Sequence, residues 1–142
     1  MSSRNSTYAI GHKSLDADHE AIIGLWRTLE ATKTMDAARN AAVRLMDETL
    51  GHFSREEVFM AQCGFPHLAE HRASHQDLAG KLRRIILSSN SHKDFVGAIC
   101  TLMERWVTVH IVVDDAKIAP YARALAERMA KALSQQAAAR RS

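Results

Sequence analysis

Histidine is the residue type that stands out in this sequence, with eight in 142 residues. Several lie four positions from another histidine or from an acid, as in His52 with Glu56 and His71 with His75. Residues four apart share one face of an α-helix, so each pair directs two side chains the same way. Imidazole nitrogens and carboxylate oxygens together suit mid-row transition metals. The spacing therefore indicates a metal site built on helices.

One such pair is weak support for a metal site, because a lone buried histidine is more often a hydrogen-bonded core residue than a ligand. The argument becomes strong when further candidates on other helices join the pairs, namely His19, His110, Asp114 and Asp115. Burying so many imidazoles and carboxylates without a metal would be costly. Structural zinc sites use four ligands, usually with cysteine, whereas here more than four nitrogen and oxygen donors are present. We therefore expect two ions such as iron.

The hydrophobic pattern predicts the helices that must position these side chains. Apolar residues recur at helical spacing over the ranges 15–32, 36–62, 67–87, 93–118 and 121–136. Long helices with short connections give an all-α fold, an antiparallel up-down four-helix bundle with a short C-terminal helix. The length fits a single domain, 1–142, with its core at about 8–121 and a terminal helix and frayed tail at 122–142.

The heights of the candidate ligands along the predicted helices agree. His19 and the pair His71/His75 lie near helix starts, while His52/Glu56 and His110 lie near helix ends. In an up-down bundle these places fall at the same end, so the ligands form one layer.

Two local patterns within these helices bear on how they pack. The second helix has an expected inner stripe of Val43, Met46, Leu50 and Phe53. The stretch 106–113 is rich in β-branched residues and would suit a buried strand by propensity alone. Because the chain offers such a strand no partner, we expect packing to hold it helical.

Composition narrows the function classes. The net charge is +3, and the excess of basic residues lies after residue 121, so nucleic-acid binding is not expected. No run of about 18 apolar residues is present, which predicts no membrane span. The polar stretch 1–7 does not resemble a secretory signal. Cys63 and Cys100 are too few for a disulfide framework, so we expect a reducing, cytoplasmic location.

These motifs resemble those of the hemerythrins, specifically the bacterial single-domain members, over about residues 8–121. The stretches that carry the likeness are Leu15-Asp-Ala-Asp-His19, His52-Phe-Ser-Arg-Glu-Glu57 followed by Met60, Phe65-Pro66 with His71-x-x-x-His75, and Trp106-Val-Thr-Val-His110-Ile111 with Asp115. In combination these motifs are specific.

The resemblance implies a centre of two iron ions per chain, bridged by two carboxylates and a hydroxide. Its ligands would be His19, His52, Glu56, His71, His75, His110 and Asp115. His71, His75 and His110 would fill one iron, while His19 and His52 would leave one position open on the other. That position would bind O2 reversibly, or small anions such as azide. Candidate walls of the O2 pocket are Ile22, Ile23, Leu78, Trp106, Val107 and Ile111, although ordinary core residues look the same in sequence.

Helical geometry and the resemblance disagree about one ligand. Asp114 lies four positions after His110, the spacing that shares a helix face, whereas Asp115 lies five positions after it. Spacing alone selects Asp114, and the resemblance selects Asp115. We follow the resemblance.

Three functions remain open from the sequence. The first is an O2-binding protein for carriage, storage or delivery, which is not an enzyme. The second is an O2 or redox sensor that acts through a partner protein. The third is a di-iron oxidase or peroxidase, which the histidine-rich ligand set disfavours, because bundle oxidases use more carboxylates.

Overall fold

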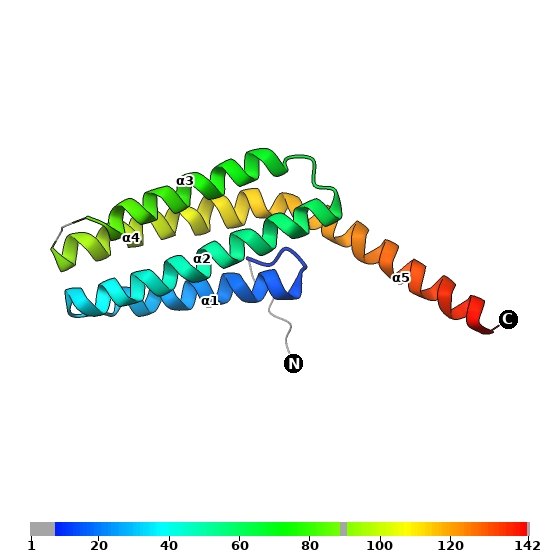
Figure 1. Cartoon of the computed structure of the whole chain (residues 1–142), viewed down its shortest axis with the longest axis horizontal. Coiled ribbons are helices and arrows are strands. Elements are labelled where there is room, and N and C mark those ends of the chain that lie inside the picture. The colour runs from blue at the N-terminus through cyan, green and yellow to red at the C-terminus, as the bar shows by residue number, and fades with distance from the viewer. Residues whose placement is uncertain (1–7, 89–90, 142) are drawn as a thin grey trace.

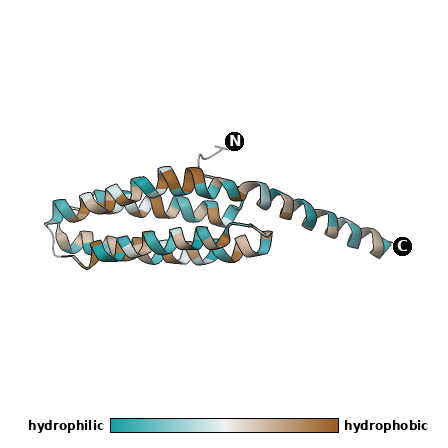
Figure 2. Cartoon of the chain, turned by 90° about the horizontal axis from the view of Figure 1, so that it is seen from above, coloured by the Kyte–Doolittle hydropathy of each residue, from teal (hydrophilic) through white to brown (hydrophobic). Residues whose placement is uncertain are grey.

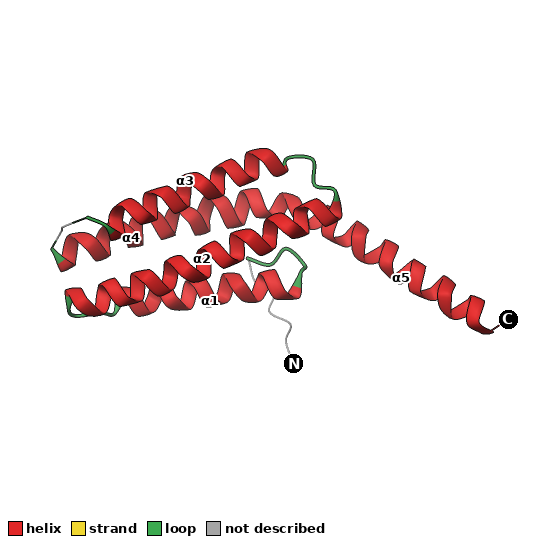
Figure 3. Ribbon diagram, viewed as in Figure 1, coloured by secondary structure: helices red, strands yellow, loops and turns green. Residues whose placement is uncertain are grey.

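Four antiparallel helices pack side by side in the computed structural model, which describes residues 8–88 and 91–141 (Figure 1). They are α1 (Lys13–Glu30), α2 (Met35–Cys63), α3 (Leu68–Ile86) and α4 (His92–Arg105). Every regular element in the described part of the chain is helical (Figure 3). The predicted all-α bundle is therefore confirmed. The polar stretch 1–7 lies outside the described residues.

Local capping explains where the helices begin and end. The side chains of His12, Thr34 and Ser91 each accept a hydrogen bond from a backbone N–H in the first turn of α1, α2 and α4. These bonds satisfy donors that a helix start leaves without partners. Gly64 ends α2 with φ 72°, a left-handed conformation that glycine adopts without steric cost.

The helical path does not end with α4. It continues through a π-helical segment, η1 (Trp106–Asp114), a short 3-10 turn, η2 (Asp115–Ile118), and α5 (Ala119–Arg141). The β-branched stretch is thus helical, as expected, but it is wound more loosely than an α-helix. A strongly hydrophobic stretch precedes α5 in the hydropathy view (Figure 2).

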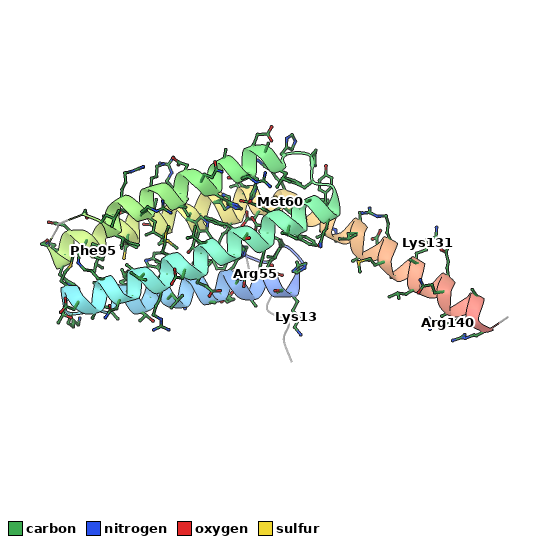
Figure 4. All side chains as sticks on the ribbon, in the orientation of Figure 1. Lys13, Arg55, Met60, Phe95, Lys131 and Arg140 are labelled. Atoms are coloured by element: carbon green, nitrogen blue, oxygen red, sulfur yellow. The ribbon has the colours of Figure 1, made fainter. Side chains whose placement is uncertain are left out.

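The last helix is longer than the sequence suggested. α5 has 23 residues and continues to Arg141, where we expected a helix over 121–136 and a frayed tail. Pro120 does not interrupt the path, because it lies in the first turn of α5, where a missing N–H costs no helical hydrogen bond. Beyond Leu125 the described residues of α5 are exposed, and the helix projects from the bundle with Lys131 and Arg140 in solvent (Figure 4).

Two apolar clusters fill the bundle at different heights. The larger one includes Ile22, Leu45, Phe95 and Ile99, all fully buried. The smaller one lies at the end from which α5 leaves, and it includes Leu15, Met60, Phe65, Ile118 and Ala122. The two clusters leave a layer between them that apolar residues do not fill.

The expected inner stripe of α2 is partly wrong. Val43 and Leu50 are 49% and 39% exposed, whereas Ala38, Ala42 and Leu45 are buried. Small alanines allow α2 to approach its neighbours closely, and this contact turns Val43 and Leu50 outward. Periodicity alone could not choose between two adjacent faces of similar hydrophobicity.

The helical path from His92 to Arg141 is long and apolar enough to cross a membrane by length and composition alone. Of its most apolar stretch, 33% is buried. A core helix of a bundle passes the same test. Phe95, Ile99, Trp106 and Ile111 of this path pack in the bundle core.

The glycine at the end of α2 allows a matched test of this fold. We expect Gly64→Ala to lower the free energy of unfolding by about 1 kcal/mol, because only the left-handed backbone opposes the new methyl group. Gly97→Ala, inside α4 and equally free of nearby atoms, should raise it by up to about 1 kcal/mol. Urea unfolding of both variants measures the difference. Equal changes in the free energy of unfolding would contradict the assignment of Gly64 as the C-terminal cap of α2.

Candidate metal centre

A layer of buried polar side chains crosses the bundle between the two apolar clusters. Three helices and the two segments that continue α4 contribute to it: His19 from α1, His52 and Glu56 from α2, His71 and His75 from α3, His110 from η1 and Asp115 from η2. None of the seven is more than 6% exposed. The structure thus brings together all seven residues that the resemblance to the hemerythrins implies as ligands.

The layer divides into two overlapping groups. Within each group, the candidate ligand atoms lie within 4.8 Å of one another. The first group contains three histidines, His71, His75 and His110. The second contains two, His19 and His52. Glu56 and Asp115 belong to both groups, so each carboxylate is placed to bridge two ions.

The two oxygens of each carboxylate face different groups. Glu56 Oε1 lies 2.7 Å from His71 Nε2, and Oε2 lies 3.3 Å from His52 Nε2. Asp115 Oδ1 lies 3.0 Å from His71 Nε2, and Oδ2 lies 3.2 Å from His19 Nε2. A bridging carboxylate needs this separation of its oxygens between two positive centres.

The donor atoms fit metal binding better than hydrogen bonding. The Nε2 atoms of His19 and His52 are 3.1 Å apart, and those of His75 and His110 are 3.0 Å apart. Histidine nitrogens lie 3.0 to 3.3 Å from Glu56 Oε2 and both Asp115 oxygens, but not in hydrogen-bonding geometry. Buried carboxylate oxygens left in this way are costly. Cations between the converging atoms would remove the cost, so the residues present fit a two-metal site.

The π-helical segment places Asp115, and not Asp114, in the layer. In η1 the backbone bonds to the fifth residue along, so a turn holds more residues than in an α-helix. Asp115, five positions after His110, therefore comes to the same side of the helix, and its Oδ1 lies 3.1 Å from His110 Nε2. The Asp114 side chain is 34% exposed and contacts His110 only on its outer nitrogen, at 3.7 Å.

Groups outside the layer orient the histidine rings. The outer nitrogen, Nδ1, pairs in four of the five cases: His19 with the Tyr8 carbonyl at 2.8 Å, His52 with Asp18 at 3.2 Å, His75 with Glu57 at 3.0 Å, and His110 with Ser74 at 3.3 Å. Such contacts fix ring orientation and raise ligand basicity. The neighbouring residue Arg55, labelled in Figure 4, donates to Asp18 over 2.9 Å.

Sequence reasoning missed some of these orienting groups. Asp18 and Ser74 had no signal of their own, because each reaches a histidine on another helix. Asp16, which lies close to His19 in the sequence, is not one of them: its carboxylate accepts from the backbone N–H of Ile10, at 2.7 Å.

The predicted pocket walls lie in the core beside the layer. Ile22, Ile23, Trp106, Val107 and Ile111 are buried, and Leu78 packs partly buried against them. The Trp106 ring meets His19 and His52 edge-on, with centroids 6.0 and 6.3 Å apart. Phe53, which was not among the predicted walls, stacks on His75 at 3.9 Å.

In the metal-free layer, the carboxylates and the histidines shift one another's pKa. Burial lowers the pKa of His71, but Asp115 and Glu56 outweigh it and raise the pKa from 6.5 to about 9. Burial raises the pKa of Glu56, but His52, His71 and His75 outweigh it and hold the pKa well below its usual range. Without metal, the layer therefore holds imidazolium–carboxylate pairs.

The two adjacent acids provide a matched pair of variants. We expect Asp115→Asn to weaken metal binding at least about tenfold, because the neutral amide cannot bridge two ions. Asp114→Asn should leave the final metal content unchanged. Elemental analysis of both purified proteins checks this. Equal losses, or a loss in the Asp114 variant alone, would show that the π-helical register is not the binding register.

The raised pKa of His71 gives the metal-free protein a pH dependence with a definite sign. Protonated His71 stabilises the fold fully below pH 6.5, and this stabilisation is lost as the pH rises towards about 9. Metal needs the neutral ring, so its stabilising effect grows over the same window. We expect the melting temperature of the metal-bound protein to exceed that of the stripped protein, and the gap to widen between pH 6.5 and 9. A narrowing gap would contradict this assignment.

Comparison with known proteins agrees with this geometry. A family model described as the hemerythrin HHE cation binding domain matches residues 11–122. A bacteriohemerythrin of Stenotrophomonas maltophilia is 28% identical over 127 residues, covering 86% of this chain and 82% of that protein. A myohemerythrin of Riftia pachyptila is 24% identical over 113 residues, covering 80% and 87%. The matched residues include the whole polar layer, and the chain belongs to the hemerythrin family.

Proposed function

We propose that this protein is a non-haem di-iron protein that binds O2 reversibly, for carriage, storage or delivery. One observation carries the proposal. Five histidines divide unequally, three and two, around the same pair of carboxylates. Three histidines would hold one iron and only two would hold the other, which would leave a vacant position on the second iron. The vacancy would lie beside His19 and His52.

The surroundings of the proposed open position support binding over chemical turnover. His19 and His52 are fully buried, and Ile22 and Trp106 close the core beside them. Iron bound there would supply the electrons that O2 binding requires. The role of this chain's residues is to hold two imidazoles in place and to exclude water, so that a reduced oxygen species does not escape. A small anion such as azide could occupy the same position.

The ligand set disfavours an oxidase. Di-iron oxidases built on bundles use a carboxylate from each of several helices, whereas only Glu56 and Asp115 supply carboxylates to this layer among the described residues. We also propose a reducing, cytoplasmic setting, which the free thiols of Cys63 and Cys100 suit.

A sensor that acts through a partner is the second candidate, and α5 favours it. This helix continues directly from the segment that carries His110 and Asp115. Its outer part is exposed, including Met129 at 57% and Leu133 at 65%. A change at the layer would therefore have a direct path to an accessible surface.

The O2-binding proposal is tested with the purified protein, deoxygenated and then aired, and with azide added to the oxidised form. We expect two irons per chain and a visible spectrum that reverses when O2 is removed. Ile22→Ala should admit water and speed loss of the oxygenated form without loss of iron. Ile99→Ala, an equal truncation elsewhere in the same cluster, is the control.

Two outcomes would overturn the proposal. Zinc in place of iron in protein from iron-replete cells would remove its basis. Continuous O2 consumption with a reductant, at about 1 per second or faster, would replace the carrier with an oxidase. If both alanine variants lose the oxygenated form at the same rate, the open position does not lie beside Ile22.

A further inference from the structure

His71 differs from the other four histidines of the layer in its outer nitrogen. The other four have Nδ1 held by a backbone carbonyl, a carboxylate or a hydroxyl. No described residue forms a hydrogen bond with Nδ1 of His71, although its Nε2 lies 2.7 Å from Glu56. This Nδ1 is also absent from the fully enclosed unpaired atoms of the core. It therefore keeps contact with the exterior.

A cavity of about 420 Å³ lies where α3 begins, beside η1 and η2. His71 lines it, so the exterior that its Nδ1 meets is this cavity. The other polar side chains of its lining are His67, Glu70, Ser74, Asp114 and Lys117. The cavity thus joins the surface to the three-histidine side of the metal layer.

The side chains that line this cavity range from exposed to buried. Those of Glu70 and His67 are 73% and 67% exposed, that of Asp114 is 34% exposed, and that of His71 is 4% exposed. Carboxylate and imidazole are donors that divalent first-row ions accept. A cation entering from solvent would therefore exchange its waters for protein ligands in steps.

The alternative approaches are less suitable. The two-histidine side is closed, because His19 and His52 are 0% exposed. Two smaller cavities, of about 210 and 170 Å³, reach His75 and His110. There the outer nitrogens pair with Glu57 and Ser74, so a turn of either ring would break a contact at Nδ1 that His71 does not have.

We propose that this cavity is the entry route for ferrous ions, with Glu70 and Asp114 as transient ligands and His71 as the ligand that turns to pass the ion inward. The proposal rests on the di-iron function proposed above. His71 suits this role because its Nε2 contacts the carboxylates of the layer, while its Nδ1 has no hydrogen-bond partner among the described residues. Lys117 opposes a cation in the cavity, and its Nζ lies 3.5 Å from Asp114 Oδ1. Removing that charge should therefore make entry faster.

The test follows iron uptake by the protein prepared without metal, with ferrous ion added anaerobically. We expect the double variant Glu70→Gln, Asp114→Asn to load about three- to tenfold more slowly at low salt. Lys117→Gln should load faster than the wild type. The control is Glu30→Gln, which removes an exposed carboxylate at the C-terminal end of α1, outside the lining of this cavity. All differences should shrink at about 0.5 M salt.

Iron release from the loaded protein to an excess of chelator gives a second measurement, since the ion leaves by the same route. The double variant should release iron more slowly, with an unchanged final content and circular dichroism spectrum. Loading and release at the rates of the Glu30 control would overturn the entry route. A lower final iron content would also overturn it, because Glu70 or Asp114 would then hold a resident ion. Failure of the wild type itself to take up two irons would instead reject the di-iron function.

Discussion

The sharing of two buried carboxylates among five imidazoles is the constraint on which this structure depends. Glu56 and Asp115 are fully buried, and each presents one oxygen to a group of three histidines and the other to a group of two. Negative charge in a low-dielectric core requires compensating positive charge. Protons on the imidazoles supply it in the metal-free chain, and metal ions can supply it with better geometry. Fold, protonation and metal binding are therefore coupled through the same atoms.

The bundle meets this constraint by enclosing the polar layer between two apolar clusters. The larger cluster stiffens the long part of the bundle, and the smaller one closes the end near α5. Outer partners such as Asp18 and Glu57 then hold the histidine rings in their planes. The enclosure is uneven, since His19 and His52 are sealed while His71 borders a polar cavity. One side of the layer suits a protected ligand site, and the other suits exchange with solvent.

The π-helical segment shows how local backbone geometry and the site depend on each other. An α-helix would place Asp114 under His110 and leave Asp115 turned away. The looser winding of η1 reverses this, so the residue five positions along enters the layer. The stretch that winds loosely is the β-branched one, whose helix propensity is low. The same residues that weaken the α-helix thus permit the register that the site needs.

The sequence by itself determined the helical fold, the layer and most of its ligands. Spacings such as His52/Glu56 and His71/His75 are local, and a helix converts them directly into shared faces. Tertiary structure decided the rest. Asp115, which the family resemblance implies and helical spacing does not, enters the layer through a change of helical winding. Asp18 and Ser74 reach histidines only across helices, and Val43 turns outward where alanines set the approach of α2. These outcomes depend on how helices pack, and a one-dimensional period carries no information about the distance or rotation between two helices.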